Sequence, residues 1–196
     1  MVISLDQIKA LRDETGISVI QCKKALEEAK GDLSKALLAL RRRGAEVAAK
    51  KSDRTFGAGT VAAYIHAGGA VGAMAELLTE TDFVAKNEEF QKLAYDIAMH
   101  VAALNPEFVR KEDVPEEARA AARELFEKEV EGKPLNLKGK ILEGKLSAFF
   151  KERILLEQSF VKNPDLTVRD LVEAASQKFG ERITIARVAR FSVLGR

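Results

Sequence analysis

The chain has 196 residues, of which 46% are apolar, enough for one large hydrophobic core or for a medium domain beside a small one. Its 32 Lys and Arg and 30 Asp and Glu nearly cancel, so the overall charge does not point to nucleic acid or anionic lipid as a partner. No apolar run approaches the roughly 20 residues that cross a bilayer, and the N-terminus carries acids where a signal peptide would be basic, which predicts a cytoplasmic protein.

The single cysteine and the distribution of charge narrow the possibilities further. Because Cys22 has no second cysteine to pair with, an intrachain disulfide and a cysteine-rich metal site are excluded, and we interpret it as a small packed residue. Residues 1–55 hold 12 Lys and Arg against 8 Asp and Glu, whereas residues 56–196 hold 20 against 22. A basic first part of the chain is suited to an acidic surface on a partner protein.

Three short helices are predicted in the first 44 residues. Ser4 with Gln7 and Ser18 with Gln21 have the spacing of capping boxes, and Asp32 can cap the third helix. The glycines expected to end these helices in the left-handed conformation are Gly16, Gly31 and Gly44. Apolar residues recur at the spacing of one buried helix face, so the segment is predicted to be a compact three-helix module.

A domain boundary is predicted near residue 55. The segment 45–54 is rich in Ala and Lys and favours a helix, and Gly57 and Gly59 then mark a change of pattern. We therefore divide the chain into a helical domain at residues 1–55 and a second domain at residues 56–196.

The second domain is predicted to hold an antiparallel three-stranded sheet packed with helices, which is an α+β fold. Two apolar runs, residues 61–66 and 71–79, flank a Gly-Gly turn and indicate a β-hairpin. Residues 183–193 alternate like a third strand. The helices predicted between the hairpin and this strand run from Phe90 to Asn105, from Pro115 to about Gly132, around Leu142 to Phe150, and from Thr167 to Gly180.

The segment Thr81-Asp82-Phe83-Val84 joins the hairpin to the first of these helices. Asp82 can accept backbone N–H bonds at a helix start, but a large aromatic residue beside it in a polar connection is not what turn chemistry favours. The residues alone leave two interpretations open. Phe83 is either a probe for another protein or a hydrophobic staple that folds back on its own helix.

Motifs for catalysis and metal binding are absent from the sequence. It contains no phosphate-binding loop, dinucleotide fingerprint or nucleophile elbow, and two histidines, His66 and His100, are too few to nominate a metal site. Catalysis by the chain itself is therefore not expected. The run Arg41-Arg42-Arg43 would suit nucleic acid, but no aromatic residues interleave it. Because basic residues also complement the end of a helix, we interpret this run as a solvated helix end.

Three segments together resemble the elongation factor Ts family, the nucleotide exchange factors of elongation factor Tu. Residues 8–16 (IKALRDETG), followed by Cys22-Lys23-Lys24-Ala25-Leu26, resemble the ubiquitin-associated-like domain of that family. The other two segments are Glu80-Thr81-Asp82-Phe83-Val84-Ala85 and residues 155–162 (LLEQSFVK). Order and spacing agree over essentially the whole chain, which resembles the short bacterial type with a single core.

The resemblance implies a site and a mechanism. Thr81, Asp82, Phe83 and Val84 would enter the GTPase domain of elongation factor Tu near its bound Mg²⁺, with Phe83 as a wedge, so that the partner releases GDP and can bind GTP. The chain itself would use no cofactor, hold no metal and hydrolyse nothing. The weaker partner-contact candidates that the resemblance implies are Leu11, Arg12, Thr15, Gly16 and His66.

The resemblance also implies an assembly. Longer relatives carry two copies of the core, so a chain with one copy would supply both the Phe83 wedge and the His66 hairpin to one partner by forming a homodimer. Such a dimer would bind two copies of elongation factor Tu and contact neither nucleic acid nor a membrane. The leading alternative is an adaptor, with a ubiquitin-associated-like domain and no exchange activity. Nucleic-acid binding and an enzyme acting on a small molecule rank below it.

Overall fold

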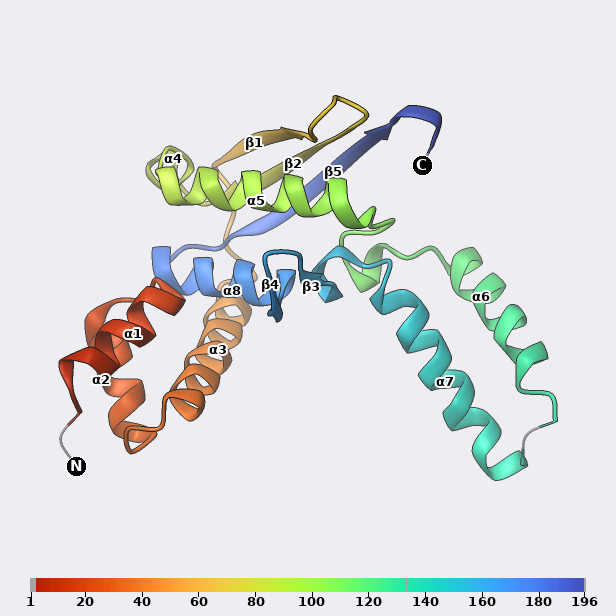
Figure 1. Ribbon diagram of the computed structural model, residues 1–196, viewed down its shortest axis with the longest axis horizontal. Helices are drawn as coiled ribbons and strands as arrows, with labels where there is room; N and C mark the ends of the chain where they lie inside the picture. Colours follow the sequence, from red (N-terminus) through yellow and green to blue (C-terminus); the bar gives the residue numbers. More distant parts are fainter. Residues whose placement is uncertain (1–2, 133, 196) are drawn as a thin grey trace.

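Three antiparallel strands form the sheet that the alternating segments predict. In this computed structural model, which describes residues 3–132 and 134–195, β1 (Ala58–Ile65) pairs with β2 (Val71–Thr79), and β2 pairs with β5 (Thr184–Ser192). The strand order is β1-β2-β5, so β2 is the central strand (Figure 1). The hairpin, the third strand and the α+β fold class are therefore confirmed.

Helix α5 (Glu88–Leu104) covers one face of this sheet. Its buried side includes Phe90, Ile97 and Val101, which share a hydrophobic core with Leu77 and Ile185 of the sheet. The predicted end of the helix at Asn105 is confirmed, and Asn105 itself takes the left-handed conformation (φ 48°) that often closes a helix. The helix therefore fixes the side of the sheet on which the core lies.

Helix α8 (Val168–Phe179) adds a second helix to the same core. Thr167 and Asp170 form the predicted capping box, with both reciprocal hydrogen bonds present, and Gly180 ends the helix with φ 69°. Val168 and Val172 carry its buried side into the core. The chain then runs directly from Gly180 into β5.

The opposite face of the sheet is open to solvent. Val61 and Ile65 of β1, Met74 of β2 and Phe191 of β5 are all large apolar residues with exposed side chains, and we call these four residues the open sheet face. The strand register places Ile65 and Phe191 on either side of Gly72, and Met74 between two alanines. The face is therefore apolar toward the hairpin tip, while the next row along the strands holds the Glu76–Arg187 ion pair.

The N-terminal module consists of α1 (Leu5–Thr15), α2 (Val19–Glu28) and α3 (Leu33–Lys50), as predicted. Ser4 and Gln7 form a complete capping box, whereas Ser18 accepts the Gln21 N–H. Its helices enclose a small core of their own, formed by Ile8, Leu11, Ile17, Cys22, Ala25, Leu26, Ala36 and Leu40. Cys22 is buried and unpaired within it, in agreement with its interpretation as a packed residue.

Gly44 does not end a helix, so the sequence prediction for this residue is wrong. Helix α3 continues through Gly44 to Lys50 and includes much of the segment that was predicted as a separate helix. Gly44 is buried against α8, and a Cβ at this position would lie 3.3 Å from the Glu173 carbonyl oxygen. The glycine therefore serves a close approach of two helices rather than a left-handed cap.

Two helices form an arm that extends away from the sheet (Figure 1). They are α6 (Glu116–Glu129), which Pro115 precedes as predicted, and α7 (Leu135–Lys151). The rings of Phe126 and Phe149 meet edge to face at 5.5 Å and join the two helices. These two helices pack on each other, whereas α5 and α8 share a hydrophobic core with the sheet.

Several short elements were not anticipated from the sequence. A four-residue helix, α4 (Asp82–Ala85), occupies the connection between β2 and α5, and a small hairpin of β3 (Ser159–Phe160) and β4 (Asn163–Thr167) precedes α8. The remaining short elements are 3₁₀ helices at Lys111–Asp113, Leu155–Glu157 and Val193–Gly195. All are too short to show a hydrophobic period.

Candidate partner-binding site

The segment from Glu80 to Ala85, which we call the α4 turn, is held to the protein at its inner side. Val84 and Ala85 are buried, and Val84 belongs to the main core beneath the sheet. Thr81 is the N-cap residue in an extended conformation (φ −125°, ψ 157°). Because neighbouring residues of a helical turn point in different directions, anchoring Val84 turns the preceding side chain outward.

Phe83 is the most exposed of the large apolar side chains in the described part of the chain, with an exposed fraction of 84%. The hydrophobic staple left open by the sequence is therefore not formed, because a staple would bury the ring against its own helix. Covering a side chain of this kind is worth about 1.5 to 3 kcal/mol. The free protein gains none of this, so the exposed ring favours the probe interpretation.

Asp82 places a negative charge beside the exposed ring. Its carboxylate Oδ2 lies 2.7 Å from Lys86 Nζ, one helical turn away, and both side chains are exposed. The hydrogen bond and the charge of Lys86 hold the pKa of Asp82 below its usual value. The α4 turn thus presents an apolar ring and an ionised carboxylate side by side.

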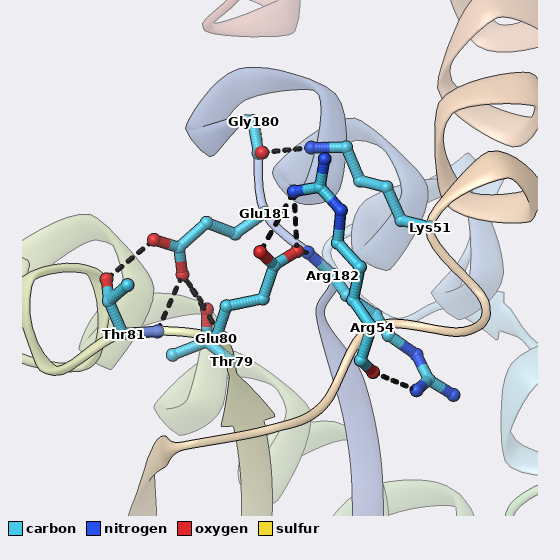
Figure 2. Close-up of polar contacts among 8 residues, drawn as sticks. All are labelled: Lys51, Arg54, Thr79, Glu80, Thr81, Gly180, Glu181 and Arg182. Carbon is cyan, nitrogen blue, oxygen red and sulfur yellow. Dashed lines mark hydrogen bonds and ion pairs between the residues drawn. The ribbon is translucent and has the colours of Figure 1, made fainter.

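A carboxylate from a distant part of the chain anchors the start of the α4 turn. Glu181, between α8 and β5, accepts hydrogen bonds from the Thr79 hydroxyl (2.7 Å) and from the Thr81 hydroxyl (2.6 Å). It also accepts the backbone N–H groups of Glu80 (3.1 Å) and Thr81 (3.0 Å), as Figure 2 shows in part. Desolvation raises the pKa of Glu181, but the hydrogen bonds from Thr81 and Thr79 outweigh it, so the pKa is lowered.

Glu80 connects the same turn to the segment that leaves the N-terminal module. Its carboxylate accepts from Arg54 Nη1 at 2.9 Å and from the Arg182 backbone N–H, and the Arg182 guanidinium donates to the Arg54 carbonyl (Figure 2). Lys51, just after α3, donates to the Gly180 carbonyl. The end of the N-terminal module and the α4 turn are therefore tied to one short stretch, residues 180–182.

One of the predicted N-terminal contact residues, Gly16, lies next to Lys178, which in turn reaches α5 close to the α4 turn. Gly16 ends α1 with φ 66°, and a Cβ there would lie 3.0 Å from Lys178 Nζ. Lys178 also pairs with Glu89 in the first turn of α5, a few residues after Phe83. Burial lowers the pKa of Lys178, and the nearby charge of Arg12 adds to this effect. Arg12 and Gly16 are exposed, and Thr15 is half-buried with its hydroxyl bonded to the Leu11 carbonyl.

Two of the predicted contact residues lie inside the protein instead. Leu11 has an exposed fraction of 0% in the core of the N-terminal module, and Val84 has 9% in the main core. Burial of apolar side chains at these positions already stabilises the free chain. Leu11 and Val84 are therefore buried in the free chain, where they hold the neighbouring exposed groups in place, and their contact with a partner stays a prediction.

His66 is not brought together with Phe83. It follows β1 at the hairpin tip, exposed, with Nδ1 3.0 Å from the Tyr64 hydroxyl. The register pairs Ala58 with Thr79, so the α4 turn lies at the other end of the hairpin. At about 3.3 Å per residue, the length of β1 separates the two sites by roughly 25 Å. One protomer therefore presents its two exposed candidates at opposite ends of the sheet.

Two kinds of feature were not found among the described residues, a cluster of metal ligands and a membrane-spanning helix. Among residues 3–132 and 134–195, no cluster of three or more His, Cys, Asp or Glu side chains could hold a metal ion. Within the same residues, none of the helices has the length and apolar character needed to cross a membrane.

Sequence reasoning found Thr81, Asp82 and Phe83 but missed Glu181, Lys178 and Glu80 as residues that shape the site. Glu181 and Thr81 are 100 residues apart in the sequence. No local period or spacing links such residues, because the contact exists only after the sheet forms. The Gly-Glu-Arg sequence after α8 could at most have marked the end of the helix.

Comparison with known proteins places the chain among translation factors. The family model described as elongation factor TS matches residues 38–195. Elongation factor Ts of Carboxydothermus hydrogenoformans is 50% identical over 194 residues, which cover 98% of this chain and 89% of that protein. Elongation factor Ts of Herpetosiphon aurantiacus is 46% identical, with 98% of both chains covered, and that of Thermotoga maritima is 44% identical, with 98% and 97% covered.

Proposed function

The chain belongs to the elongation factor Ts family of translation elongation factors, and on that premise we propose that it promotes release of GDP from elongation factor Tu so that GTP can bind. The observation that carries this proposal is the exposed Phe83 on an anchored turn beside the Asp82 carboxylate. We place this activity in the cytoplasm, where translation elongation takes place.

Thr81, Asp82 and Phe83 form the contact that disturbs the Mg²⁺ and phosphate site of the partner in this proposal. The Phe83 ring acts as the wedge, because it is apolar and exposed and the turn around it is anchored by Glu181 and by Val84. Asp82 accompanies it with a negative charge, which is suited to repelling bound phosphate and attracting Mg²⁺ away from it. Val84 contributes by packing alone.

The exchange is a coupling of two binding equilibria and needs no catalysis by this chain. A factor that binds nucleotide-free elongation factor Tu better than the GDP form weakens GDP binding by the same ratio. Couplings of about 1 to 3 kcal/mol correspond to ratios of roughly 5 to 150. Burial of one Phe supplies about 1.5 to 3 kcal/mol, so the Phe83 ring is large enough to account for such a ratio.

The two domains have separate tasks in this proposal. The helical domain at residues 1–55 docks on the GTPase domain through the exposed end of α1, at Arg12, Thr15 and Gly16. The domain at residues 56–196 carries the wedge. Each domain has its own cluster of buried apolar residues, and this supports the division near residue 55.

We further propose that the protein acts as a homodimer that binds two copies of elongation factor Tu. His66 and Phe83 lie at opposite ends of one hairpin, and a dimer would bring His66 of one protomer and Phe83 of the other to the same partner. The open sheet face offers exposed apolar side chains to a second copy of the chain. A closed two-fold dimer is the default for such a self-complementary face.

Release of a fluorescent GDP from elongation factor Tu, followed by stopped flow with excess unlabelled nucleotide, tests the proposed function. The wild-type protein should accelerate release, and Phe83→Ala should reduce the acceleration about tenfold to a hundredfold. Leu125→Ala is the matched control, because it removes another exposed apolar side chain from the arm and should retain the wild-type rate. If the wild-type protein binds elongation factor Tu without accelerating release, the adaptor function replaces exchange.

A further inference from the structure

Glu181 stands apart from the other acidic side chains around the α4 turn. Many ion pairs among the described residues join an exposed Lys or Arg to an exposed acid, and such pairs contribute little to stability. Glu181 instead accepts four hydrogen bonds from three consecutive residues, Thr79 to Thr81. A charged acceptor with several donors in fixed positions constrains geometry strongly.

We propose that Glu181 is a positioning residue for nucleotide exchange, which fixes the backbone of the α4 turn so that Phe83 is presented in the orientation that the partner requires. This inference rests on the proposed function. Glu181 lies outside the Thr81 to Phe83 segment and acts through the turn, without contact with the partner.

The backbone donors of the α4 turn have no strand to bond with. Pairing of β2 with β5 ends at Leu78 and Thr184, and the following N–H groups of Glu80 and Thr81 are directed at the Glu181 carboxylate. A backbone donor without a fixed acceptor leaves its peptide group free to reorient. Glu181 therefore replaces the missing strand at the point where the chain leaves the sheet.

The arrangement is reciprocal, which makes it stiffer than a single cap. While Glu181 accepts the N–H groups of residues 80 and 81, Glu80 accepts the N–H of Arg182 in return. The two segments thus hold each other through both carboxylates (Figure 2). A shift of the turn would have to break hydrogen bonds on both segments.

Phe83 lies between two fixed points as a result. Thr81, two residues before it, is bonded to Glu181 through its N–H and its hydroxyl, and Val84, directly after it, is buried in the core. The ring itself has no support, because its side chain is exposed. Its position in the free protein is therefore set by the turn, and preorganisation of this kind lowers the cost of ordering a contact on binding.

Two substitutions of Glu181 test its hydrogen bonds, one by removing them and one by keeping most of them at the same side-chain size. Glu181→Ala removes all four acceptor contacts. Glu181→Gln keeps one oxygen for the two N–H groups and the Thr79 hydroxyl, and its amide can donate to Thr81 Oγ1 once that hydroxyl rotates. Gln therefore serves as the conservative rescue. Glu157→Ala is the control, because it removes a carboxylate that pairs with Arg169 away from the turn.

The experiment measures the acceleration of GDP release by these variants in the wild-type and Phe83→Ala backgrounds. Glu181→Ala should lower the acceleration about tenfold, while Glu181→Gln and Glu157→Ala stay within about twofold of wild type. With Phe83→Ala already present, Glu181→Ala should have a much smaller effect, limited to Thr81 and Asp82, because the anchor acts mainly through the ring. Equal losses in both backgrounds, or an unchanged rate for Glu181→Ala, would overturn the inference.

Amide hydrogen exchange of the free protein gives a readout that is independent of the partner. In Glu181→Ala the N–H groups of Glu80 and Thr81 should exchange faster, while those in the middle of α5 stay protected. Unchanged exchange at both amides overturns the anchoring role of Glu181. If the anchor is confirmed but the wild-type protein fails to accelerate GDP release, the proposed function has failed, and with it the role in exchange.

Discussion

The α4 turn and the open sheet face both expose a phenylalanine, but they do so in different ways. Phe83 stands alone on a short turn that Glu181 and Val84 hold in place, with 84% of its side chain exposed. Phe191, 73% exposed, lies in a strand beside other apolar side chains of the open sheet face. A single fixed ring suits insertion into a partner, whereas a row of apolar residues suits a continuous interface.

The largest effect is expected from a charge placed on the open sheet face, which should dissociate the proposed dimer. Phe191→Asp would bury a carboxylate from each protomer in the proposed dimer, and an unpaired buried charge costs several kcal/mol. We expect the dimer dissociation constant to rise at least about a hundredfold. Sedimentation velocity measures the shift from dimer to monomer.

The matched variant Phe83→Asp should leave the sedimentation coefficient unchanged, because the α4 turn lies outside the open sheet face. The comparison fails if the wild-type protein is a monomer at all concentrations, or if both variants dissociate it equally.

Substitutions of Val84 and Phe83 should differ in their effect on stability, because Val84 is on the buried side of the α4 turn and Phe83 is on the exposed side. Val84→Ala removes two methyl groups from the core and should lower the free energy of unfolding by about 1 to 3 kcal/mol. Phe83→Ala removes an exposed ring and should change it by less than about 0.5 kcal/mol. Chemical denaturation of the two variants compares them directly, and a larger loss for Phe83→Ala would show that the ring packs against the protein.

Mild acid should destabilise the fold through His100 while the carboxylates of the α4 turn keep their charge. His100 is fully buried, with Nε2 2.8 Å from Gln158 Oε1 and Nδ1 accepting the Val161 N–H at 3.2 Å. Burial lowers its pKa below 6.5, although the hydrogen bond to Gln158 opposes this. The unfolded chain therefore binds a proton more readily than the folded chain, and the free energy of unfolding should fall as the pH drops below about 6.5.

The size of this effect is at most about 1.4 kcal/mol per pH unit for one proton. The carboxyl pKa values of Asp82 and Glu181 are lowered instead, so the exposed charge of the turn and its Glu181 anchor stay ionised over the same range. Denaturation curves at pH 7.5 and 5.5 measure the loss, and His100→Gln should reduce it. A loss that is as large in His100→Gln as in wild type would assign it to other groups.

Local patterns in the sequence predicted the parts of the fold that local forces decide. Alternation of apolar residues located the three strands, and the Ser4 and Thr167 caps located two helix starts. Both signals depend only on residues that are close together in the sequence. Gly44 was misread, since a glycine in a helix looks the same whether it ends the helix or allows another helix to approach.

The candidate site was predictable only in part, for a related reason. Phe83 stood out because an aromatic residue in a polar turn contradicts local chemistry. The burial of Leu11 and Val84 and the anchor at Glu181 depend on which segments meet in three dimensions, and Glu181 meets residues about 100 positions away. Side-chain direction on a four-residue helix likewise has no periodic signal.

The affinity of the protein for two forms of elongation factor Tu tests the wedge mechanism most directly. Calorimetric titration of wild type and Phe83→Ala against nucleotide-free and GDP-bound elongation factor Tu gives the coupling ratio for each. We expect wild type to bind the nucleotide-free form more tightly by roughly 5- to 150-fold, and Phe83→Ala to lose affinity mainly for that form, so that the ratio falls. Equal losses for both forms would contradict the mechanism, because Phe83 would then contribute binding without favouring GDP release.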